Sequence, residues 1–112
     1  MKVYTICGSM KFENQMKEVS SKLEAEEGIC VLTPINYEKK HKDDITELEN
    51  IFACHMKKIE LSDGIYVLNV DGYIGESTKN QISYAKKLGK EIKYYRPLEG
   101  ETKISKKVKK TK

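Results

Sequence analysis

Polar segments with glycine follow two apolar runs of the chain, and they hold residue types that can do chemistry. Gly8 and Ser9 come directly after the run at residues 2–7, and Asp71 follows the run at residues 65–70. A glycine lets a ligand approach the backbone, and a serine hydroxyl beside helix N–H groups suits a phosphate or a sugar hydroxyl. The carboxylate of Asp71 can accept hydrogen bonds from a sugar or act as a general acid. Turn formation accounts for these three residues equally well.

Four other candidate residues have simpler structural explanations. Asp63 precedes the third apolar run, where an aspartate forms a turn, and Glu76 stands at a helix start, where the dipole stabilises a carboxylate. His55 falls on or beside the apolar stripe of a helix, which indicates a partly buried, hydrogen-bonded histidine rather than a catalytic base. Cys7 can act as a nucleophile only with an activating base, and the sequence places no histidine beside it.

The composition is that of a single soluble domain with a basic end. The chain has 112 residues and a net charge of +4. Residues 101–112 carry six lysines and one glutamate, which leaves a net charge of −1 for residues 1–100. Nucleic acid is not an expected partner, because a domain that binds it concentrates basic groups on a folded face. No apolar run approaches the roughly 20 residues that span a bilayer, so a cytoplasmic location without membrane contact is expected.

Several common kinds of site are absent from the sequence. The cysteines Cys7, Cys30 and Cys54 form no CxxC pair, so they give neither a disulfide framework nor a zinc pattern. The P-loop spacing GxxxxGK[ST] and the three-glycine dinucleotide fingerprint are missing as well. No metal site and no cofactor are therefore expected.

Apolar patterns alternate between strands and helices along the chain. Four short apolar runs predict strands, at residues 2–7, 29–32, 65–70 and 91–95. The second of these is expected to be buried on both faces. Three segments with apolar residues three or four apart predict helices, at residues 12–27, 44–61 and 77–88. The helix ends are expected at Gly28 as a left-handed cap, at Asp44 with Glu47 as a capping box, and at Ser77 or Thr78 as an N-cap.

This order predicts an α/β fold. It is a small doubly wound parallel sheet, flavodoxin- or Rossmann-like, with about four strands in the order 2-1-3-4 and helices on both faces. Residues 1–98 are expected to form the domain, and residues 99–112 a flexible Lys-rich tail. Ligands bind such sheets beyond the carboxyl ends of the strands, where the strand order reverses. The reversal lies between the first and third strands, so residues 7–12 and 70–78 are expected to face each other.

Three motifs in this order resemble the nucleoside 2-deoxyribosyltransferase superfamily, which includes the deoxynucleoside 5′-monophosphate N-glycosidases. The resemblance runs from Lys2 to about Tyr95. Its carriers are VYTICGSM at residues 3–10, LSDG at residues 61–64, and GESTKNQISYA at residues 75–85 followed by LGK at residues 88–90. The last motif is the most specific of the three.

The resemblance implies cleavage of an N-glycosidic bond. A glutamate attacks the anomeric carbon of the deoxyribose, the base departs, and the sugar passes to another base or to water. It also implies a small-molecule nucleoside or nucleotide as ligand, no cofactor, and a homo-oligomer. The implied substrate-binding residues are Gly8, Ser9, Met10, Gly75, Glu76 and Ser77, and the implied catalytic positions are Asp63, Asp71 and Gln81.

Gln81 departs from the family pattern, because it stands where the resemblance places the nucleophilic glutamate. A neutral amide is a poor nucleophile and does not offset charge on an oxocarbenium-like transition state. The loss of such a group lowers the rate by a factor on the order of 10³–10⁶. Glu76 lies five residues earlier, about 140° around a helix, and replaces it only if the helix begins after it and the loop folds inward. Two interpretations stay open, a glycosyl-cleaving enzyme and a catalytically silent nucleoside- or nucleotide-binding protein.

A third interpretation is a protein whose Lys-rich end contacts nucleic acid. It is the weakest of the three, because residues 1–100 are close to neutral.

Overall fold

Four strands and three α-helices make up the part of the chain that the computed structural model describes, residues 1–34 and 41–96. The strands are β1 (Val3–Cys7), β2 (Cys30–Leu32), β3 (Gly64–Val67) and β4 (Glu91–Tyr94). The α-helices are α1 (Glu13–Glu27), α3 (Ile45–Leu61) and α4 (Glu76–Lys87). Short 3-10 helices follow β1 and β3, at η1 (Met10–Phe12) and η2 (Val70–Gly72).

The strands form one parallel sheet in the order β2-β1-β3-β4. Thr5 in β1 lies opposite Leu32 of β2 and Ile65 of β3, and Ile65 lies opposite Ile92 of β4. Each of the first three strands is followed by a helix that returns the chain to the other end of the sheet, which a parallel arrangement requires. The order predicted from the alternation of strands and helices is confirmed, and the protein has a small doubly wound α/β fold.

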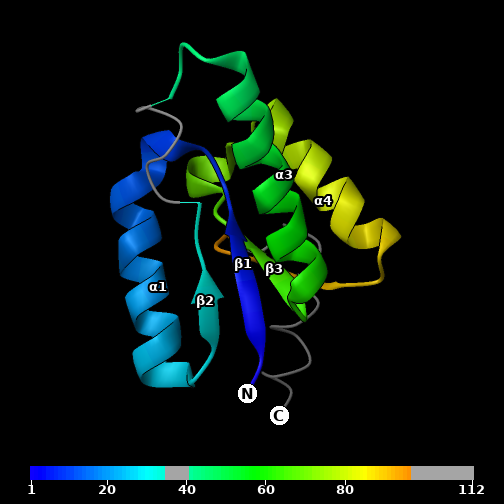
Figure 1. Ribbon diagram of the computed structural model, residues 1–112. Helices are drawn as coiled ribbons and strands as arrows, with labels where there is room; N and C mark the ends of the chain where they lie inside the picture. Colours follow the sequence, from blue (N-terminus) through cyan, green and yellow to red (C-terminus); the bar gives the residue numbers. More distant parts are fainter. Residues whose placement is uncertain (35–40, 97–112) are drawn as a thin grey trace.

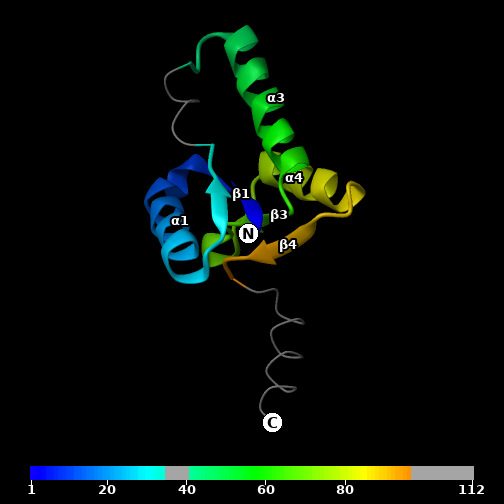
Figure 2. The ribbon, with the colours of Figure 1, turned by 60° about the horizontal axis from the view of Figure 1, so that its bottom comes forward.

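Helices cover both faces of the sheet. Figures 1 and 2 show α1 on one side and the pair α3 and α4 together on the other. The core beneath α1 consists of Ile6, Met16, Val19, Leu23 and Leu68. The core beneath α3 and α4 consists of Cys7, Ile59, Ile65, Val67, Ile82 and Ala85. Successive residues of β1 and β3 point to opposite faces, so both strands contribute to both cores.

Two of the three predicted helix ends are confirmed. Gly28 follows α1 in the left-handed conformation, with φ 65°, which glycine adopts at little cost. Asp44 precedes α3, and its side chain accepts a hydrogen bond from the backbone N–H of Glu47 at 3.0 Å. The second bond of the expected capping box does not form, because the Asp44 N–H donates to the carbonyl of His41 and the Glu47 carboxylate contacts the His41 ring.

The predicted start of α4 is wrong. The helix begins at Glu76 with Gly75 as its N-cap, so Ser77 and Thr78 lie inside the first turn, where Thr78 is buried. The Tyr73 hydroxyl packs against Gly75, where a Cβ atom would lie 3.2 Å from it. The helix therefore begins before the residues, Ser77 and Thr78, whose hydroxyl groups predicted the N-cap. No side chain caps this helix, which leaves its first N–H groups available.

Two burial predictions are also corrected. The second strand, β2, is half-buried rather than buried on both faces, because it lies at the edge of the sheet and pairs only with β1. The apolar stripe of α3 packs on the core only in its second half, at His55 and Ile59, while Ile45 and Phe52 are exposed. Figures 1 and 2 show the first half of α3 extending beyond the sheet.

The predicted tail at residues 99–112 and the predicted domain end at residue 98 lie outside the described residues. Within residues 1–34 and 41–96, no helix combines the length and the apolar character needed to cross a membrane.

Candidate functional site

The loops that follow β1 and β3 leave the carboxyl edge of the sheet side by side. The backbone N–H of Leu68 donates a hydrogen bond to the carbonyl of Cys7 at 2.8 Å. A Cβ atom on Gly8 would lie 2.9 Å from the Cβ of Leu68, closer than two carbon atoms tolerate. A glycine is therefore needed at residue 8 for the first loop to pass the second.

A cleft of about 580 Å³ opens at this edge. Its volume is in the range of pockets that hold small molecules. The lining residues come from the loop after β1, from α3, and from the start of α4. They are Gly8, Ser9, Met10, Lys11, Pro34, Leu48, Ile51, Phe52, His55, Tyr73, Gly75, Glu76, Ser77, Thr78 and Gln81. The prediction that residues 7–12 and 70–78 face each other is confirmed.

Seven of the nine residues singled out by the resemblance line this cleft. They are Gly8, Ser9, Met10, Gly75, Glu76, Ser77 and Gln81. Ser9 precedes η1, and its hydroxyl oxygen accepts a weak hydrogen bond from the backbone N–H of Lys11 at 3.3 Å. That hydroxyl keeps its own proton to donate to a ligand.

Asp71 does not reach the cleft. Its backbone has φ 55°, a left-handed turn conformation, which aspartate tolerates better than most residues. Its side chain is 88% exposed and forms an ion pair with Arg96 at 3.7 Å. The turn before Gly72 therefore explains this residue, and a contact of Asp71 with a sugar stays a prediction.

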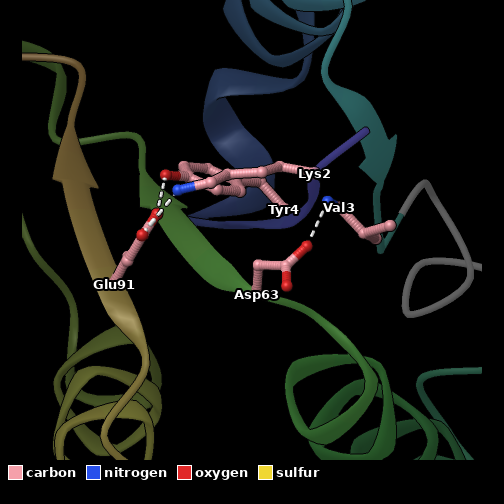
Figure 3. A network of polar contacts seen from close by, with 5 residues as sticks. All are labelled: Lys2, Val3, Tyr4, Asp63 and Glu91. Carbon is pink, nitrogen blue, oxygen red and sulfur yellow. Dashed lines mark hydrogen bonds and ion pairs between the residues drawn. The ribbon is translucent and has the colours of Figure 1, made fainter.

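Asp63 lies at the opposite end of β3 from the cleft. Its carboxylate accepts a hydrogen bond from the backbone N–H of Val3 at 2.8 Å, which ties the start of β3 to the start of β1. Figure 3 shows this contact beside a second one, in which the Tyr4 hydroxyl and the Lys2 ammonium donate to Glu91. These contacts bind the amino ends of three strands together. The geometry gives Asp63 a structural position, not the catalytic one that the resemblance implied.

His55 lines the cleft, a position that no motif of the sequence predicts. It is 6% exposed. Burial, together with the positive charge of Lys58, lowers the pKa of His55 to about 4, against a smaller opposite effect of Gln81. The imidazole is therefore neutral at pH 7. The partly buried character predicted for His55 is confirmed, but its place in the cleft was not foreseen.

Cys7 contacts this histidine. Its Sγ lies 3.7 Å from Nε2 of His55, so the expectation that no histidine stands beside Cys7 is wrong. The contact arises because α3 packs against β1. Burial raises the pKa of the Cys7 thiol to about 12, so the thiol keeps its proton at neutral pH and is a poor nucleophile.

An aromatic and cationic group forms one wall of the cleft. The Lys11 ammonium lies 3.7 Å from the centroid of the Tyr73 ring. Tyr73 in turn meets Phe12 edge to face, with 6.0 Å between the ring centroids. A cation at this distance is attracted to the electron-rich face of the ring. Lys11 thus supplies positive charge near the start of α4, where Glu76 supplies negative charge.

The remaining lining residues could not be recognised from their own types. They are Lys11, Pro34, Leu48, Ile51, Phe52, Tyr73 and Thr78. Leu48, Ile51 and Phe52 belong to α3, whose apolar stripe predicts core packing. The length of α3 is one signal for them. A helix of 17 residues is much longer than the neighbouring strands of four or five, so part of its apolar stripe lies beyond the sheet.

Comparison of the chain with models of known protein families, with curated proteins and with solved structures gave no match. In the part of the chain that the structure describes, no group of three or more His, Cys, Asp or Glu side chains is arranged to hold a metal ion. The function is therefore inferred from the chemistry of the cleft together with the resemblance of its motifs.

Proposed function

We propose that the cleft binds a nucleoside or a nucleoside 5′-monophosphate, and that the chain does not cleave the N-glycosidic bond. The cleft lies where the strand order reverses, which is where doubly wound sheets bind their ligands. The observation that carries the proposal is the presence of Gln81 in this cleft, at the position where the resemblance requires a glutamate.

The two ends of such a ligand find suitable partners. The uncapped start of α4 and the hydroxyl of Ser9 offer hydrogen-bond donors to a phosphate or a sugar hydroxyl. The ammonium of Lys11 adds positive charge on the same side. The side chains of Ile51 and Phe52 offer an apolar and aromatic surface to a base.

The three catalytic positions that the resemblance implies bring no carboxylate into the cleft. Asp63 and Asp71 lie outside it, and Gln81 supplies a neutral amide. An amide does not form the glycosyl ester that a carboxylate nucleophile forms, and it does not stabilise a positively charged transition state.

Glu76 supports a second candidate function, cleavage of the N-glycosidic bond with Glu76 as nucleophile. It is the one carboxylate among the described residues that line the cleft. In this reaction a carboxylate oxygen bonds to the anomeric carbon while the base leaves with the electrons of the N-glycosidic bond. Water then hydrolyses the sugar ester. Glu76 stands in the first turn of α4, where a carboxylate interacts favourably with the helix dipole.

Calorimetry and an assay of base release separate these functions. The four common 2′-deoxynucleosides and their 5′-monophosphates are titrated into the wild type, Gln81→Glu and Glu76→Gln, and free base is followed by chromatography. We expect the wild type to bind at least one compound without releasing base, and Gln81→Glu to release base at least about 10³-fold faster.

Two other results would change the conclusion. Base release by the wild type that disappears in Glu76→Gln would establish the second function. Absence of binding to both the wild type and Gln81→Glu would overturn the proposed binding function itself.

A further inference from the structure

The side chain of Asn69 continues the pairing of the sheet where the backbone of β3 turns away. A backbone hydrogen bond runs from the N–H of Tyr95, just after β4, to the carbonyl of Val67, the last residue of β3, at 2.8 Å. Next to it, the Asn69 amide takes the place of a strand residue. Its oxygen accepts a hydrogen bond from the Arg96 N–H and its nitrogen donates one to the Arg96 carbonyl, both at 2.8 Å. Asn69 is only 3% exposed, so the loss of these partners is costly.

The same residue closes the turn that leads from β3 to the cleft. The Asn69 carbonyl accepts a hydrogen bond from the N–H of Gly72 at 2.9 Å, and the Val70 carbonyl accepts one from the N–H of Tyr73 at 3.0 Å. These bonds hold residues 69–73 in a compact turn that includes η2. Asn69 therefore ties this turn to the end of β4 through its side chain and closes it through its backbone.

Tyr73, at the end of this turn, joins the two loops that form the cleft. Its ring centroid lies 3.7 Å from the Lys11 ammonium, and the ring meets Phe12 edge to face. Its hydroxyl packs against Gly75, the N-cap of α4. Lys11 and Phe12 belong to the segment after β1, and Gly75 belongs to the loop after β3, so the place of this ring sets how the two loops meet.

We propose that Asn69 is a positioning residue for the cleft, because it holds the turn at residues 69–73 so that Tyr73 stands against Lys11 and Gly75. Tyr73 and both of these partners line the cleft, whereas Asn69 is absent from the described residues that do so. Asn69 therefore acts on a ligand through Tyr73. A wall that is ordered in advance lowers the entropy lost on binding. This inference rests on the proposed binding function and assigns the ordering of one wall of the cleft to a residue outside it.

Proton NMR without a ligand tests the positioning directly. Protons over the face of an aromatic ring are shielded, so we expect the ε-methylene resonances of Lys11 to lie upfield in the wild type and to lose this shift in Tyr73→Leu. We expect Asn69→Ala to move them toward their position in Tyr73→Leu. Arg96→Ala is the matched control, because it removes the ion pair with Asp71 and keeps the backbone groups that the Asn69 amide contacts. It should leave the Lys11 resonances in place.

A double-mutant cycle tests whether the effect on binding passes through Tyr73. Binding of 2′-deoxyadenosine 5′-monophosphate, or of the tightest of the compounds above, is measured in the wild type, Asn69→Ala, Tyr73→Leu and the double variant. We expect Asn69→Ala to weaken binding about 3- to 10-fold in the wild type, the effect of one neutral hydrogen bond, and not to weaken it further in Tyr73→Leu. Arg96→Ala should bind within about twofold of the wild type, since an exposed ion pair contributes little.

A second variant, Asn69→Asp, carries the same test if Asn69→Ala does not fold. It keeps the acceptor for the Arg96 N–H and loses the donor to the Arg96 carbonyl, so it should move the Lys11 resonances in the same direction by a smaller amount. All variants are compared at a temperature where the methyl resonances of the core residues Leu23 and Ile59 keep their wild-type positions.

These measurements separate the positioning role from the proposed function. Unchanged Lys11 resonances in a folded variant of Asn69 would overturn the inference even if nucleotides bind, because the amide would then serve only the pairing of β3 with β4. Equal losses of affinity from Asn69→Ala in both backgrounds would overturn it as well, because the effect would not pass through Tyr73. Failure of every nucleotide to bind the wild type would overturn only the binding function, and the Lys11 resonances would still decide the positioning role.

Discussion

The neutral state of His55 links its position in the cleft to the stability of the protein at acid pH. Its pKa is about 4 in the folded chain, while an exposed histidine in the unfolded chain has a pKa of about 6.5. Between these values the unfolded chain binds more protons, so the free energy of unfolding rises with pH. The full contribution is present above pH 6.5 and is lost as the pH falls toward 4. The difference corresponds to on the order of 3 kcal/mol.

Urea unfolding between pH 7 and pH 4 measures this contribution. We expect the wild type to lose clearly more stability over this range than His55→Asn, which has no group that titrates there. Hydrogen bonds from Tyr84 and Lys2 lower the pKa values of Glu60 and Glu91, respectively. Their contributions to the free energy of unfolding fall with pH equally in both proteins, so they cancel in the comparison. Equal pH dependence in the two proteins would show that folding does not lower the pKa of His55.

Substitutions of Asp63 distinguish a structural role of this residue from a catalytic one. Its hydrogen bond with the N–H of Val3 joins the starts of two strands. We expect Asp63→Ala to lower the free energy of unfolding by about 1 kcal/mol, and Asp63→Asn, which keeps an acceptor, to lower it less. Both variants should bind nucleotides as the wild type does at a temperature where they are folded. A loss of affinity or of base release without a loss of stability would restore a catalytic role to Asp63.

At the scale of elements, the pairing of β3 with β4 depends on the absence of a side chain at Gly64. A Cβ atom there would lie 2.6 Å from the carbonyl oxygen of Glu91 and 2.9 Å from its Cβ atom. One atom belongs to the backbone of Glu91 and the other is attached directly to it. The strand β4 itself therefore has to move to make room. We expect Gly64→Ala to lower the free energy of unfolding by about 2–3 kcal/mol.

Thermal unfolding by circular dichroism measures this effect. The exposed substitution Ser83→Ala on α4 provides a comparison and should change stability by less than about 0.5 kcal/mol. An unchanged midpoint in Gly64→Ala would mean that β4 pairs more loosely than the register between Gly64 and Glu91 requires.

The elements themselves follow from local sequence signals to different degrees. The sheet order was predictable because strands that alternate with helices allow few parallel topologies. The start of α3 was predictable because aspartate is a favoured N-cap residue, and the Asp44 carboxylate accepts a hydrogen bond from the backbone N–H of Glu47. The start of α4 was not, because the packing of Tyr73 against Gly75 is a contact between side chain and backbone that no capping motif records.

Some residues of the cleft are also predictable from local motifs, while others depend on long-range packing. Its place at the carboxyl edge follows from the strand order, and Gly8, Ser9 and Gln81 follow from motifs. His55 could not be placed from sequence, because its apolar neighbours on α3 predict core packing equally well. Only the packing of α3 across the end of β1 brings His55 to Cys7. The residues that depend on how two elements pack were the ones that the motifs missed.

At the scale of the molecule, the cleft joins the two sides of the sheet. Ser9 and Lys11 lead into α1 on one face, while Gln81 belongs to α4 on the other. A ligand that contacts both loops links the two helical layers across the carboxyl edge of the sheet. Binding to the folded state alone stabilises it by about 2.7 kcal/mol at a ligand concentration 100 times the Kd.

Hydrogen exchange with the tightest-binding nucleotide tests this link. We expect backbone N–H groups in residues 8–12 and 75–81 to gain protection together, in proportion to the saturation of the site. The Asp63 end of the sheet should change only through the rise in global stability, which raises the thermal midpoint by about 4–8 °C per kcal/mol in a domain of this size. Protection of only one of the two loops would mean that the ligand does not span the cleft. The α4 start would then be a separate anion site, and the pairing of Ser9 with Gln81 across one ligand would be wrong.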